Sequence, residues 1–429
     1  MPHAPQPQAE CITAFNALRT DTPRNALEVG EGCNRFPPSP LVGLYLSEAL
    51  FRLVEDGSLS VYKDPFNGGA RAAFAELIGD HLGRRLDADD ICFVRGGTEA
   101  ISLITAHLAA TGHSLTLPLP NYYAFDHCAA RWQVPIAGYY RHDGTLHPTS
   151  PTSTQHAALL DVLPNGVTGT IYTTPGGPDY DFVLLDTVIQ VGHFGTGPSP
   201  ASALRAKARA LDLEHSAIIM TASKDLGLPG IRGAAIISRN AALRAHIGRD
   251  AFDRAPAASP LGSLLMTLYA ALLTALEAPA DHLDKIHSAA QDTVARHGLP
   301  PLPPTPAIRS LLDHMARMTE HYRANFHRLA QEADILSLSA ALTPACGYSA
   351  FPELAVPQPD FLAWVRQCAL DGLRLNPTVV HGGTADAWRH LMPGQHLRIN
   401  LSESHRDLAV GLQQIRAYVT DRAARHRMC

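Results

Sequence analysis

The sequence predicts an α/β fold: a large domain built on a mixed, mostly parallel sheet, followed by a smaller α+β domain. Short apolar segments typical of buried strands alternate with helical patterns through residues 90–240, and this alternation favours a sheet covered by helices. Residues 182–189 are almost continuously apolar, which is typical of a strand buried on both faces. After residue 240, helical patterns predominate up to a proline-rich break at 298–306.

The length of 429 residues exceeds one ordinary hydrophobic core and predicts two domains. We place the boundary at the proline-rich break, because prolines favour extended linkers. The expected division is an N-terminal arm and loop over 1–49 that joins the small domain, a large domain over 50–297 and a small C-terminal domain over 298–429.

The composition argues against several classes of protein. A net charge of −5 without any basic run argues against a nucleic-acid binder. The N-terminus lacks the basic start and apolar core of a signal peptide, and the most apolar run, 261–276, is short for a membrane span. The seven cysteines are odd in number and have no paired spacing. They predict reduced thiols, no metal site and a cytoplasmic protein.

We expect the chain to begin with a loose arm over 1–25, and a short strand then leads into a glycine- and proline-rich loop at 27–40. Apolar stripes predict two helices, at 41–56 and at about 70–82, on either side of a turn cluster at 61–69. The stripe residues are Leu44, Leu46, Leu50 and Leu53 in the first helix and Phe74, Leu77 and Ile78 in the second.

A glycine pair follows the short buried strand expected at 91–94. The sequence Arg95-Gly-Gly-Thr98 opens a helix that runs to about residue 110. The free N–H groups and the dipole of a helix N-terminus form an anion site at such a place. The alternative is an ordinary helix start capped by Thr98.

Further strands are expected at 114–117, 135–140 and 168–173. Tyr122 and Tyr123 follow the first of these strands. At this position a tyrosine ring can stack on a flat ligand, and the alternative is a ring packed in the core.

Asp186 is the one acid in the apolar strand at 182–189. Burying a lone carboxylate costs several kcal/mol, so it needs a cationic partner. That partner is either a neighbouring arginine, which would be structural, or a protonated ligand. A helix at 201–211 follows.

The stretch 221–233, Thr-Ala-Ser-Lys-Asp-Leu-Gly-Leu-Pro-Gly-Ile-Arg-Gly, is the most distinctive motif, and Lys224 is one of only four lysines. Its hydroxyls, the Arg232 guanidinium and the glycines can hold a phosphate beside a covalent lysine. The alternative is a solvated lysine in a loop between strands. All these motifs fall at the carboxyl ends of predicted strands, where ligands of α/β folds bind.

The remaining chain predicts a helical segment and then the small domain. The expected elements are helices at 241–253, 258–278, 280–297, 307–332, 358–371 and 405–425 and strands at 348–351, 373–375 and 396–401. Arg398 lies between Leu397 and Ile399, so its side chain points to the opposite face of the strand. It is either part of an ion pair or a clamp for a carboxylate.

Taken in order, these motifs resemble the fold-type I pyridoxal-phosphate enzymes of the class I/II aminotransferase family. Residues 223–230, Ser-Lys-Asp-Leu-Gly-Leu-Pro-Gly, and 122–126, Tyr-Tyr-Ala-Phe-Asp, are similar to the subgroup that contains 1-aminocyclopropane-1-carboxylate synthase. The resemblance covers roughly residues 27–415. It implies an aspartate aminotransferase-like fold, pyridoxal 5′-phosphate as cofactor, amino acid and keto acid substrates, and a homodimer with shared active sites.

The resemblance also implies roles for the cofactor-binding residues. Lys224 would form the Schiff base with the cofactor aldehyde and later move a proton. Asp186 would pair with the pyridinium nitrogen, and Tyr122 would stack on the pyridine ring. The phosphate would be held by Gly97, Thr98, Thr221 and Arg232, and by Tyr62 from the other subunit.

For the substrate, the resemblance implies that Arg398 binds the carboxylate and that the loop around Gly32 and Asn34 closes over the site. A neutral amine is required at Lys224, and we expect burial and Arg232 to depress its pKa. A carboxylate near the pyridinium would keep that ring protonated, as an electron sink requires.

Two departures from the family pattern concern the cofactor's phenolic oxygen. By the order of the motifs that carry the resemblance, Gly177 stands where the family has an asparagine, and Ile189 stands where it has a tyrosine. Both usual hydrogen-bond donors are absent from these positions, and Thr174 or Thr187 could substitute.

The predicted activity is that of an aminotransferase. The missing donors keep open a lyase or cyclase of the cyclopropane-synthase type, or an amino-acid oxidase of specialised metabolism. A non-catalytic descendant that only binds ligands is a further alternative, and the presence of Lys224, Asp186, Arg232 and Arg398 argues against it.

Overall fold

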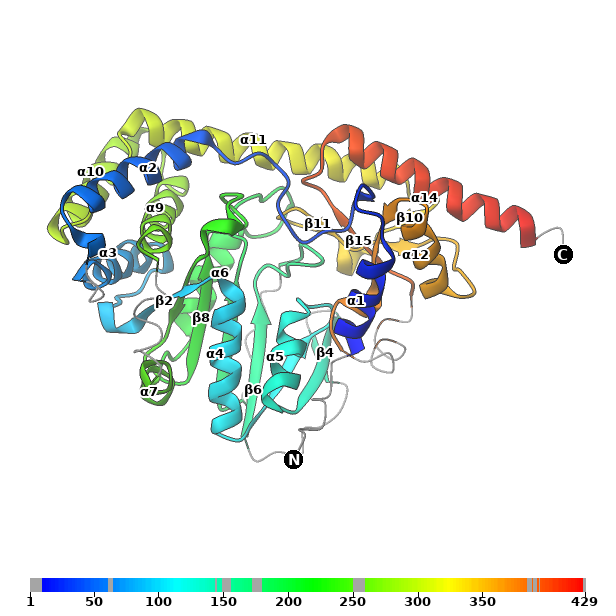
Figure 1. Cartoon of the computed structure of the whole chain (residues 1–429), viewed down its shortest axis with the longest axis horizontal. Helices are drawn as coiled ribbons and strands as arrows, with labels where there is room; N and C mark the ends of the chain where they lie inside the picture. The colour runs from blue at the N-terminus through cyan, green and yellow to red at the C-terminus, as the bar shows by residue number, and fades with distance from the viewer. Residues whose placement is uncertain are drawn as a thin grey trace.

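The structure is a computed structural model that describes residues 10–60, 65–142, 145–148, 156–171, 180–249, 259–383, 388, 392 and 394–426. Its centre is an eight-stranded sheet with the order β2-β9-β8-β7-β6-β3-β4-β5 (Figure 1). The strands are β2 (Ile91–Arg95), β3 (His113–Pro118), β4 (Ile136–His142), β5 (Thr145–Pro148), β6 (His156–Val162), β7 (Phe182–Thr187), β8 (Ser216–Thr221) and β9 (Gly233–Ile237).

The central sheet is mixed and mostly parallel, as predicted. The pairs β8–β7, β7–β6, β6–β3 and β3–β4 are parallel, whereas β9 and β5 run against their neighbours. Because the strands share a direction, the segments that follow β3, β6, β7 and β8 gather at one edge.

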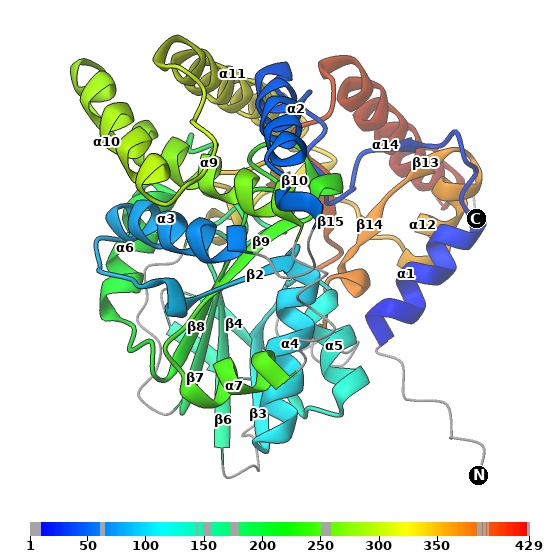
Figure 2. The same ribbon diagram turned by 60° about the vertical axis from the view of Figure 1, so that its left-hand side comes forward.

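Helices cover both faces of this sheet (Figure 2). Alternate residues of one strand belong to different buried clusters: Leu184 of β7 joins one cluster and Leu185 the other. This explains why the strands are apolar throughout. One face carries α4 (Gly97–Ala110), α5 (Ala124–Trp132) and α7 (Ala241–Arg249), and the other carries α3 (Pro65–Leu82), α6 (Pro200–Ala210) and α9 (Pro260–Leu276).

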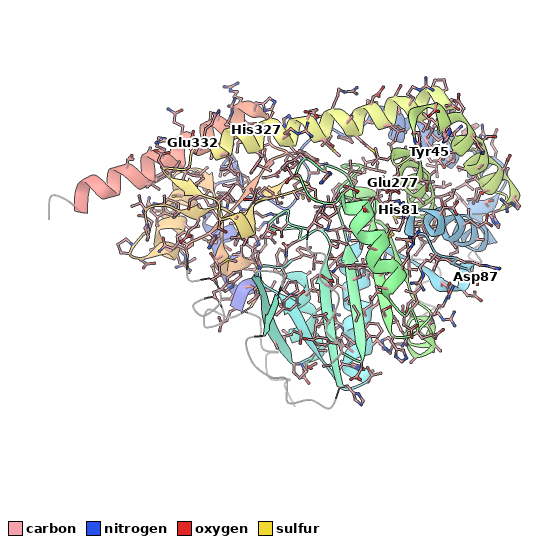
Figure 3. The ribbon with its side chains drawn as sticks, turned by 180° about the vertical axis from the view of Figure 1, so that it is seen from behind. Tyr45, His81, Asp87, Glu277, His327 and Glu332 are labelled. Atoms are coloured by element: carbon pink, nitrogen blue, oxygen red, sulfur yellow. The ribbon has the colours of Figure 1, made fainter. Side chains whose placement is uncertain are left out.

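A polar contact fastens the helices on the second face. His81 near the end of α3 lies beside Glu277, which follows α9, with 3.1 Å between Nδ1 and a carboxylate oxygen (Figure 3). Arg205 of α6 donates to the same carboxylate. Three helices from distant parts of the sequence therefore meet at one acid.

The helix α11 (Thr305–Ala330) runs along the top of Figure 1 from α2 (Pro40–Glu55), α9 and α10 (Leu283–Arg296) towards the C-terminal elements. Those elements form the sheet β11-β15-β14, the pair β10–β12 and two helices, and β13 pairs with β1 from the N-terminal part of the chain. Their bounds are β1 (Leu27–Glu28), β10 (Leu336–Ser337), β11 (Ser349–Ala350), β12 (Glu353–Leu354), α12 (Phe361–Leu370), β13 (Leu373–Arg374), β14 (Asn376–Pro377), β15 (Leu397–Asn400) and α14 (His405–His426).

The expectation of a loose arm over 1–25 was wrong for its described part. Residues Glu10–Asp21 form the helix α1. Cys11, Ile12 and Leu18 are buried, and α1 contacts α12 and the short turn at 378–380. Its own sequence is only weakly amphipathic, so the helix is stabilised by these tertiary contacts rather than by a strong local pattern.

Two further predictions need correction. The strand expected at 168–173 lies earlier, as β6, and residues 163–171 form turns and irregular structure. The stripe of α2 is rotated, because Leu44 and Leu50 are 56% and 37% exposed. The buried residues of α2 are Val42, Tyr45, Leu46, Ala49 and Leu53.

None of the described helices is long and apolar enough to cross a membrane. No disulfide joins the cysteines of the described residues.

Two adjacent glycines of α3 provide a test of the α3–α10 packing. A Cβ at Gly69 would lie 2.3 Å from the carbonyl oxygen of His297, whereas nothing lies within 4 Å of one at Gly68. Alanine favours a helix over glycine by about 1 kcal/mol, but overpacking costs about 1–3 kcal/mol. We expect Gly69→Ala to lower Tm by several degrees and Gly68→Ala to leave it unchanged or raise it, as measured by circular dichroism. Equal Tm values for the two variants would contradict the contact.

Candidate active site

A cavity lies where the segments after β3, β6, β7 and β8 meet the start of α4 and the strand β15. It brings together nearly all the predicted site residues. Its walls include Gly32, Gly97, Thr98, Tyr122, Asp186, Thr221, Lys224, Arg232 and Arg398. Tyr62 lies outside the described residues.

Lys224 follows β8 and points into this cavity. Its Nζ donates a hydrogen bond to the carbonyl oxygen of Gly32, 2.8 Å away. Burial lowers the pKa of Lys224, and the Arg398 guanidinium lowers it further, while the Cys33 thiol acts in the opposite direction. The interpretation as a solvated surface lysine is therefore wrong, and the second cation that depresses the pKa is Arg398 rather than Arg232.

The start of α4 forms one end of the cavity. The helix begins at Gly97, and its N-cap is Gly96 with a φ of 85°. Thr98 lies inside the first turn and is not the cap, so the capping interpretation was wrong. The first N–H groups of a helix have no partner within the helix. Gly97 and Thr98 line the cavity, so their N–H groups are candidate donors for an anion.

Two hydroxyls and a guanidinium lie at the same end of the cavity, where an anion could bind. Thr221 Oγ1 lies 2.8 Å from Ser223 Oγ, and both residues line the cavity. Arg232 has a φ of 63° and donates through Nη2 to the carbonyl oxygen of Arg95 at 2.9 Å. A Cβ at Gly96 would lie 2.7 Å from that Nη2, so the glycine makes room for the guanidinium. Ser223 was not among the predicted site residues.

Asp186 lies at the end of β7 and is buried. Its Oδ1 has no hydrogen-bond partner among the described residues. Burial raises the pKa of Asp186 to about 7. Two partners for Asp186 were considered from sequence, an arginine or a protonated ligand. Among the described residues, no arginine forms an ion pair with Asp186. The orphaned oxygen therefore fits a protonated group of a ligand.

Arg398 enters the cavity from β15. It donates to Ser349 Oγ at 2.9 Å and to the carbonyl oxygen of Gly166 at 2.9 Å. Among the described residues no carboxylate forms an ion pair with it, so the structural ion pair considered from sequence is not found. A buried guanidinium held only by neutral acceptors retains its attraction for a carboxylate.

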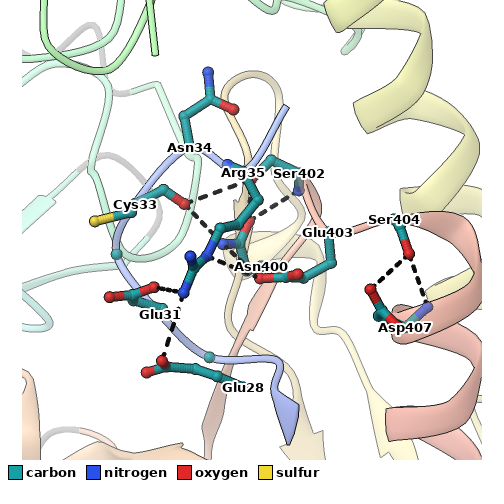
Figure 4. A network of polar contacts seen from close by, with 12 residues as sticks. Glu28, Glu31, Cys33, Asn34, Arg35, Asn400, Ser402, Glu403, Ser404 and Asp407 are labelled. Atoms are coloured by element: carbon teal, nitrogen blue, oxygen red, sulfur yellow. Dashed lines mark hydrogen bonds and ion pairs between the residues drawn. The ribbon is translucent and has the colours of Figure 1, made fainter. Parts of the chain in front are cut away.

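The glycine- and proline-rich loop is fastened to the end of β15 (Figure 4). Asn400 donates to the carbonyl oxygen of Cys33 at 2.8 Å, and Ser402 Oγ accepts from the backbone N–H of Arg35 at 2.7 Å. A Cβ at Gly32 would lie 2.7 Å from Arg398 Nη1. The loop thus covers the guanidinium closely, and a side chain at this position would displace the guanidinium.

Asn34 has a different place from the predicted one. It does not line the cavity. Its Nδ2 donates to the carbonyl oxygen of Lys224 at 2.8 Å. Asn34 therefore connects the loop to the lysine turn rather than contacting a substrate in this conformation.

The cavity wall where the cofactor's phenolic oxygen is expected also differs from the sequence-based prediction. Gly177 lies outside the described residues. The turn that follows β6 and lines the cavity is 163–167, and it presents Asn165, whose Nδ2 already donates to Pro120 at 2.8 Å. Ile189 is buried in the wall as expected. Thr187 donates to the carbonyl oxygen of Ile219 at 2.8 Å, so its hydroxyl is not a substitute donor.

Sequence reasoning also missed Tyr348 and His381, two polar side chains of the cavity wall. Tyr348 is buried, and its hydroxyl donates to the carbonyl oxygen of Gly32 at 3.0 Å. His381 is buried, and its Nε2 has no partner among the described residues. Burial lowers the pKa of His381 well below its ordinary value. Neither residue lies in a motif, because both come from connecting segments of the C-terminal part.

Known structures of low identity share this fold along nearly the whole chain. An aspartate aminotransferase mutant of Thermus thermophilus has a TM-score of 0.67 at 15% identity and covers 96% of this chain and 97% of its own. An aspartate aminotransferase of Rhodobacter sphaeroides has a TM-score of 0.64 at 17% identity, and the match covers 96% of this chain and 99% of that protein's chain. These likenesses confirm the predicted fold class.

Curated relatives are similar over shorter stretches. 1-Aminocyclopropane-1-carboxylate synthase 3 of Oryza sativa subsp. japonica is 29% identical over 42% of this chain and 46% of its own. Nicotianamine aminotransferase 1 of the same organism is 28% identical over 35% of this chain and 32% of its own. The chain thus spans less than half the length of these relatives. No protein-family profile matches it.

The buried carboxyl of Asp186 predicts a pH-dependent stability for the protein freed of any bound cofactor. Its pKa is about 7 in the folded state and about 3.9 when unfolded, so its stabilising contribution is present at low pH and lost as the pH rises to about 7. Asp186→Asn removes this loss. We expect the Tm of the variant relative to wild type to rise by several degrees between about pH 5 and about pH 8.

Differential scanning calorimetry across this range measures the effect. Asp313→Asn, which changes an exposed carboxylate on α11, serves as the control and should show no such trend. A difference in Tm between Asp186→Asn and wild type that stays constant with pH would contradict the burial of an ionisable Asp186.

Proposed function

We propose that the chain is a member of the fold-type I pyridoxal-phosphate-dependent aminotransferase family, to which it is similar in part of its sequence and in its fold, and that it transfers an amino group between an α-amino acid and a keto acid. One observation carries the proposal. Buried Asp186 and Arg398 line the cavity without an ion-pair partner among the described residues, and Lys224 lines it with them.

The residues present fit pyridoxal phosphate. When bound, this cofactor supplies an aldehyde that reacts with amines and a protonated pyridine ring that withdraws electrons from the bond being broken. Asp186 would accept a hydrogen bond from the ring N–H, which satisfies its orphaned Oδ1. The first turn of α4 together with Ser223 and Arg232 would hold the phosphate. Thr221, which was also predicted for this role, donates its hydroxyl hydrogen to the carbonyl oxygen of Gly233 at 2.9 Å, so it would position Ser223 rather than donate to the phosphate.

Lys224 would act as both the covalent anchor and the proton carrier. Its lowered pKa favours the neutral amine that such chemistry needs. The carbonyl oxygen of Gly32, which accepts from Nζ and from the Tyr348 hydroxyl, orients the amine. General base catalysis by a positioned group contributes about 10²–10⁴-fold.

Arg398 would bind the carboxylate of the amino acid. Ser349 and the Gly166 carbonyl fix the guanidinium from behind, so its orientation is set before a substrate arrives. A bidentate contact at this end would hold the substrate in one orientation relative to Lys224.

A lyase or cyclase that releases a leaving group from the substrate is the second candidate. The similarity to a cyclopropane-carboxylate synthase and the apolar Ile189 in the cavity wall favour it. Loss of a donor to the cofactor's phenolic oxygen would change how electrons are distributed after a proton is removed.

The homodimer is a further part of the proposal. The outer face of α2 exposes Leu44, Phe51 and Val54, at 56%, 63% and 60%. Contiguous exposed apolar side chains on a helix mark an interaction surface. A second copy of this chain is the occupant that the family suggests, and Tyr62, which would reach the other subunit's phosphate site, comes shortly after α2 in the chain.

Replacement of Lys224 tests the proposed class of enzyme. Purified wild-type protein incubated with pyridoxal phosphate should show the visible absorbance of a lysine-bound cofactor. Lys224→Ala should lose this band, whereas Lys285→Ala on the exposed face of α10 should keep it. Wild-type protein that gains no band with added cofactor would overturn the proposal.

The reaction itself is decided by product analysis with a panel of α-amino acids. Mass spectrometry should detect the keto acid together with an equal amount of aminated cofactor, or of aminated second substrate when a keto acid is supplied. Ammonia, peroxide or a released leaving group without amino transfer would favour the alternatives.

The α2 surface predicts the effect of a charge on oligomeric state. Phe51→Glu should shift the protein from dimer towards monomer in size-exclusion chromatography with light scattering, because the new charge would be desolvated at the interface. Leu370→Glu, at an equally exposed apolar position on α12, is the control. An unchanged dimer in Phe51→Glu would contradict the assignment of this face.

A further inference from the structure

Two histidines and an aspartate meet at the amino ends of three neighbouring strands. His113 begins β3 and His156 begins β6, and these two residues are partners in the parallel register. Asp181 immediately precedes β7, the strand on the other side of β6, and its backbone N–H donates to Ala157 at 2.9 Å. One possible ligand atom of each residue lies within 4.8 Å of those of the other two.

We propose that His113, His156 and Asp181 bind a divalent transition-metal ion of the zinc type. This site lies at the end of the strands opposite to the cavity. It does not depend on the proposed aminotransferase activity.

The spacing of the donor atoms supports the proposal. His156 Nδ1 lies 3.3 Å from Asp181 Oδ2. Zinc bonds of about 2.0–2.1 Å in tetrahedral geometry separate two ligands by about 3.3–3.4 Å. These two atoms are therefore already at the distance that a shared ion requires. The rings of His113 and His156 lie close together, with centroids 5.4 Å apart.

Hydrogen bonds from neighbouring groups orient these residues, as is usual for side chains that bind a metal. Thr111 Oγ1 donates to the carbonyl oxygen of His107 at 2.8 Å, so at its other contact, 2.8 Å from His113 Nδ1, it accepts. His113 then carries its proton on Nδ1, and the Nε2 lone pair is left for an ion. Asp181 Oδ2 accepts from the backbone N–H of Ala157 at 3.1 Å, which fixes the carboxylate.

The donor set selects among ions. Two imidazoles and one carboxylate suit zinc and its transition-metal neighbours, whereas magnesium and calcium prefer oxygen donors. The side chains of His156 and Asp181 are 50% and 54% exposed, so water completes the coordination. A bound ion would join β3, β6 and β7, whose far ends lead to Tyr122, Asn165 and Asp186. Its role is to hold these strands together rather than to catalyse.

Zinc titration of the full-length protein tests the site. Metal-free protein with its cofactor removed is titrated with Zn²⁺ in competition with a chromophoric chelator and with Co²⁺ to record visible absorbance. We expect one equivalent bound per chain, a rise in Tm with Zn²⁺, and a Co²⁺ spectrum of low coordination number. His156→Ala and Asp181→Asn should weaken zinc binding by at least about tenfold.

Two further variants separate the site from other metal binding. Thr111→Val removes the orienting hydroxyl together with its hydrogen bond to the His107 carbonyl oxygen. It should weaken zinc binding by about 10–100-fold while retaining the fold. His215→Ala changes an exposed histidine just before the neighbouring strand β8 and should leave binding unchanged. Zinc affinity that is the same in wild type and His156→Ala, or Mg²⁺ that competes with Zn²⁺ at equal concentration, would overturn the proposal.

Discussion

A buried carboxylate, Asp225, joins the elements that carry the chemistry. It follows Lys224 directly, and its Oδ2 accepts from the backbone N–H of Gln190 at 2.7 Å and from the hydroxyl of Tyr269. These contacts connect the turn after β8 to the segment after β7 and to α9. Burial raises the pKa of Asp225 to about 7, because the carboxyl is shielded from water and its partners are protein groups. The relative position of Lys224 and Asp186 depends on this three-way contact.

The sequence was sufficient for the parts of the site that are encoded locally. The lysine turn, the glycine pair before α4 and the acid in β7 each lie within one strand-to-helix or strand-to-strand connection. Their order along a mostly parallel sheet places them at one edge. Arg398 was singled out because it lies between Leu397 and Ile399 in a predicted strand, and its role as a carboxylate clamp came from the family resemblance.

Features that depend on tertiary contacts could not be predicted in this way. The helix α1 has little local signal and is stabilised by the surface it covers. Tyr348 and His381 reach the cavity from irregular segments. The turn after β6 was misplaced because residues 168–173 have strand propensity, whereas the sheet uses 156–162. The family resemblance assigned Asn34 to the loop that contacts the substrate, but in the structure its side chain contacts the backbone of Lys224.

Asp186 and Arg398, which form no ion pair among the described residues, make the cavity costly to fold and ready to bind. Isolated buried ions are destabilising by several kcal/mol each. A ligand that supplies a cation at Asp186 and an anion at Arg398 would recover that energy on binding, and the folded state would be stabilised by the ligand. Such coupling between unsatisfied burial and recognition is a common property of enzyme sites.

The N-terminal helix α1 has a consequence for how the size of the site is set. Phe15 and Arg19 line the cavity, and the ring of Phe15 stacks on Tyr123 with centroids 4.8 Å apart. This wall comes from outside the central sheet and carries none of the residues assigned to the cofactor. Its side chains can therefore diverge between related proteins without disturbing the lysine or the phosphate cradle. Under the proposed function, selectivity for the substrate side chain and the chemistry at its α-carbon would be encoded in different parts of the chain, and they could evolve, or be redesigned, separately.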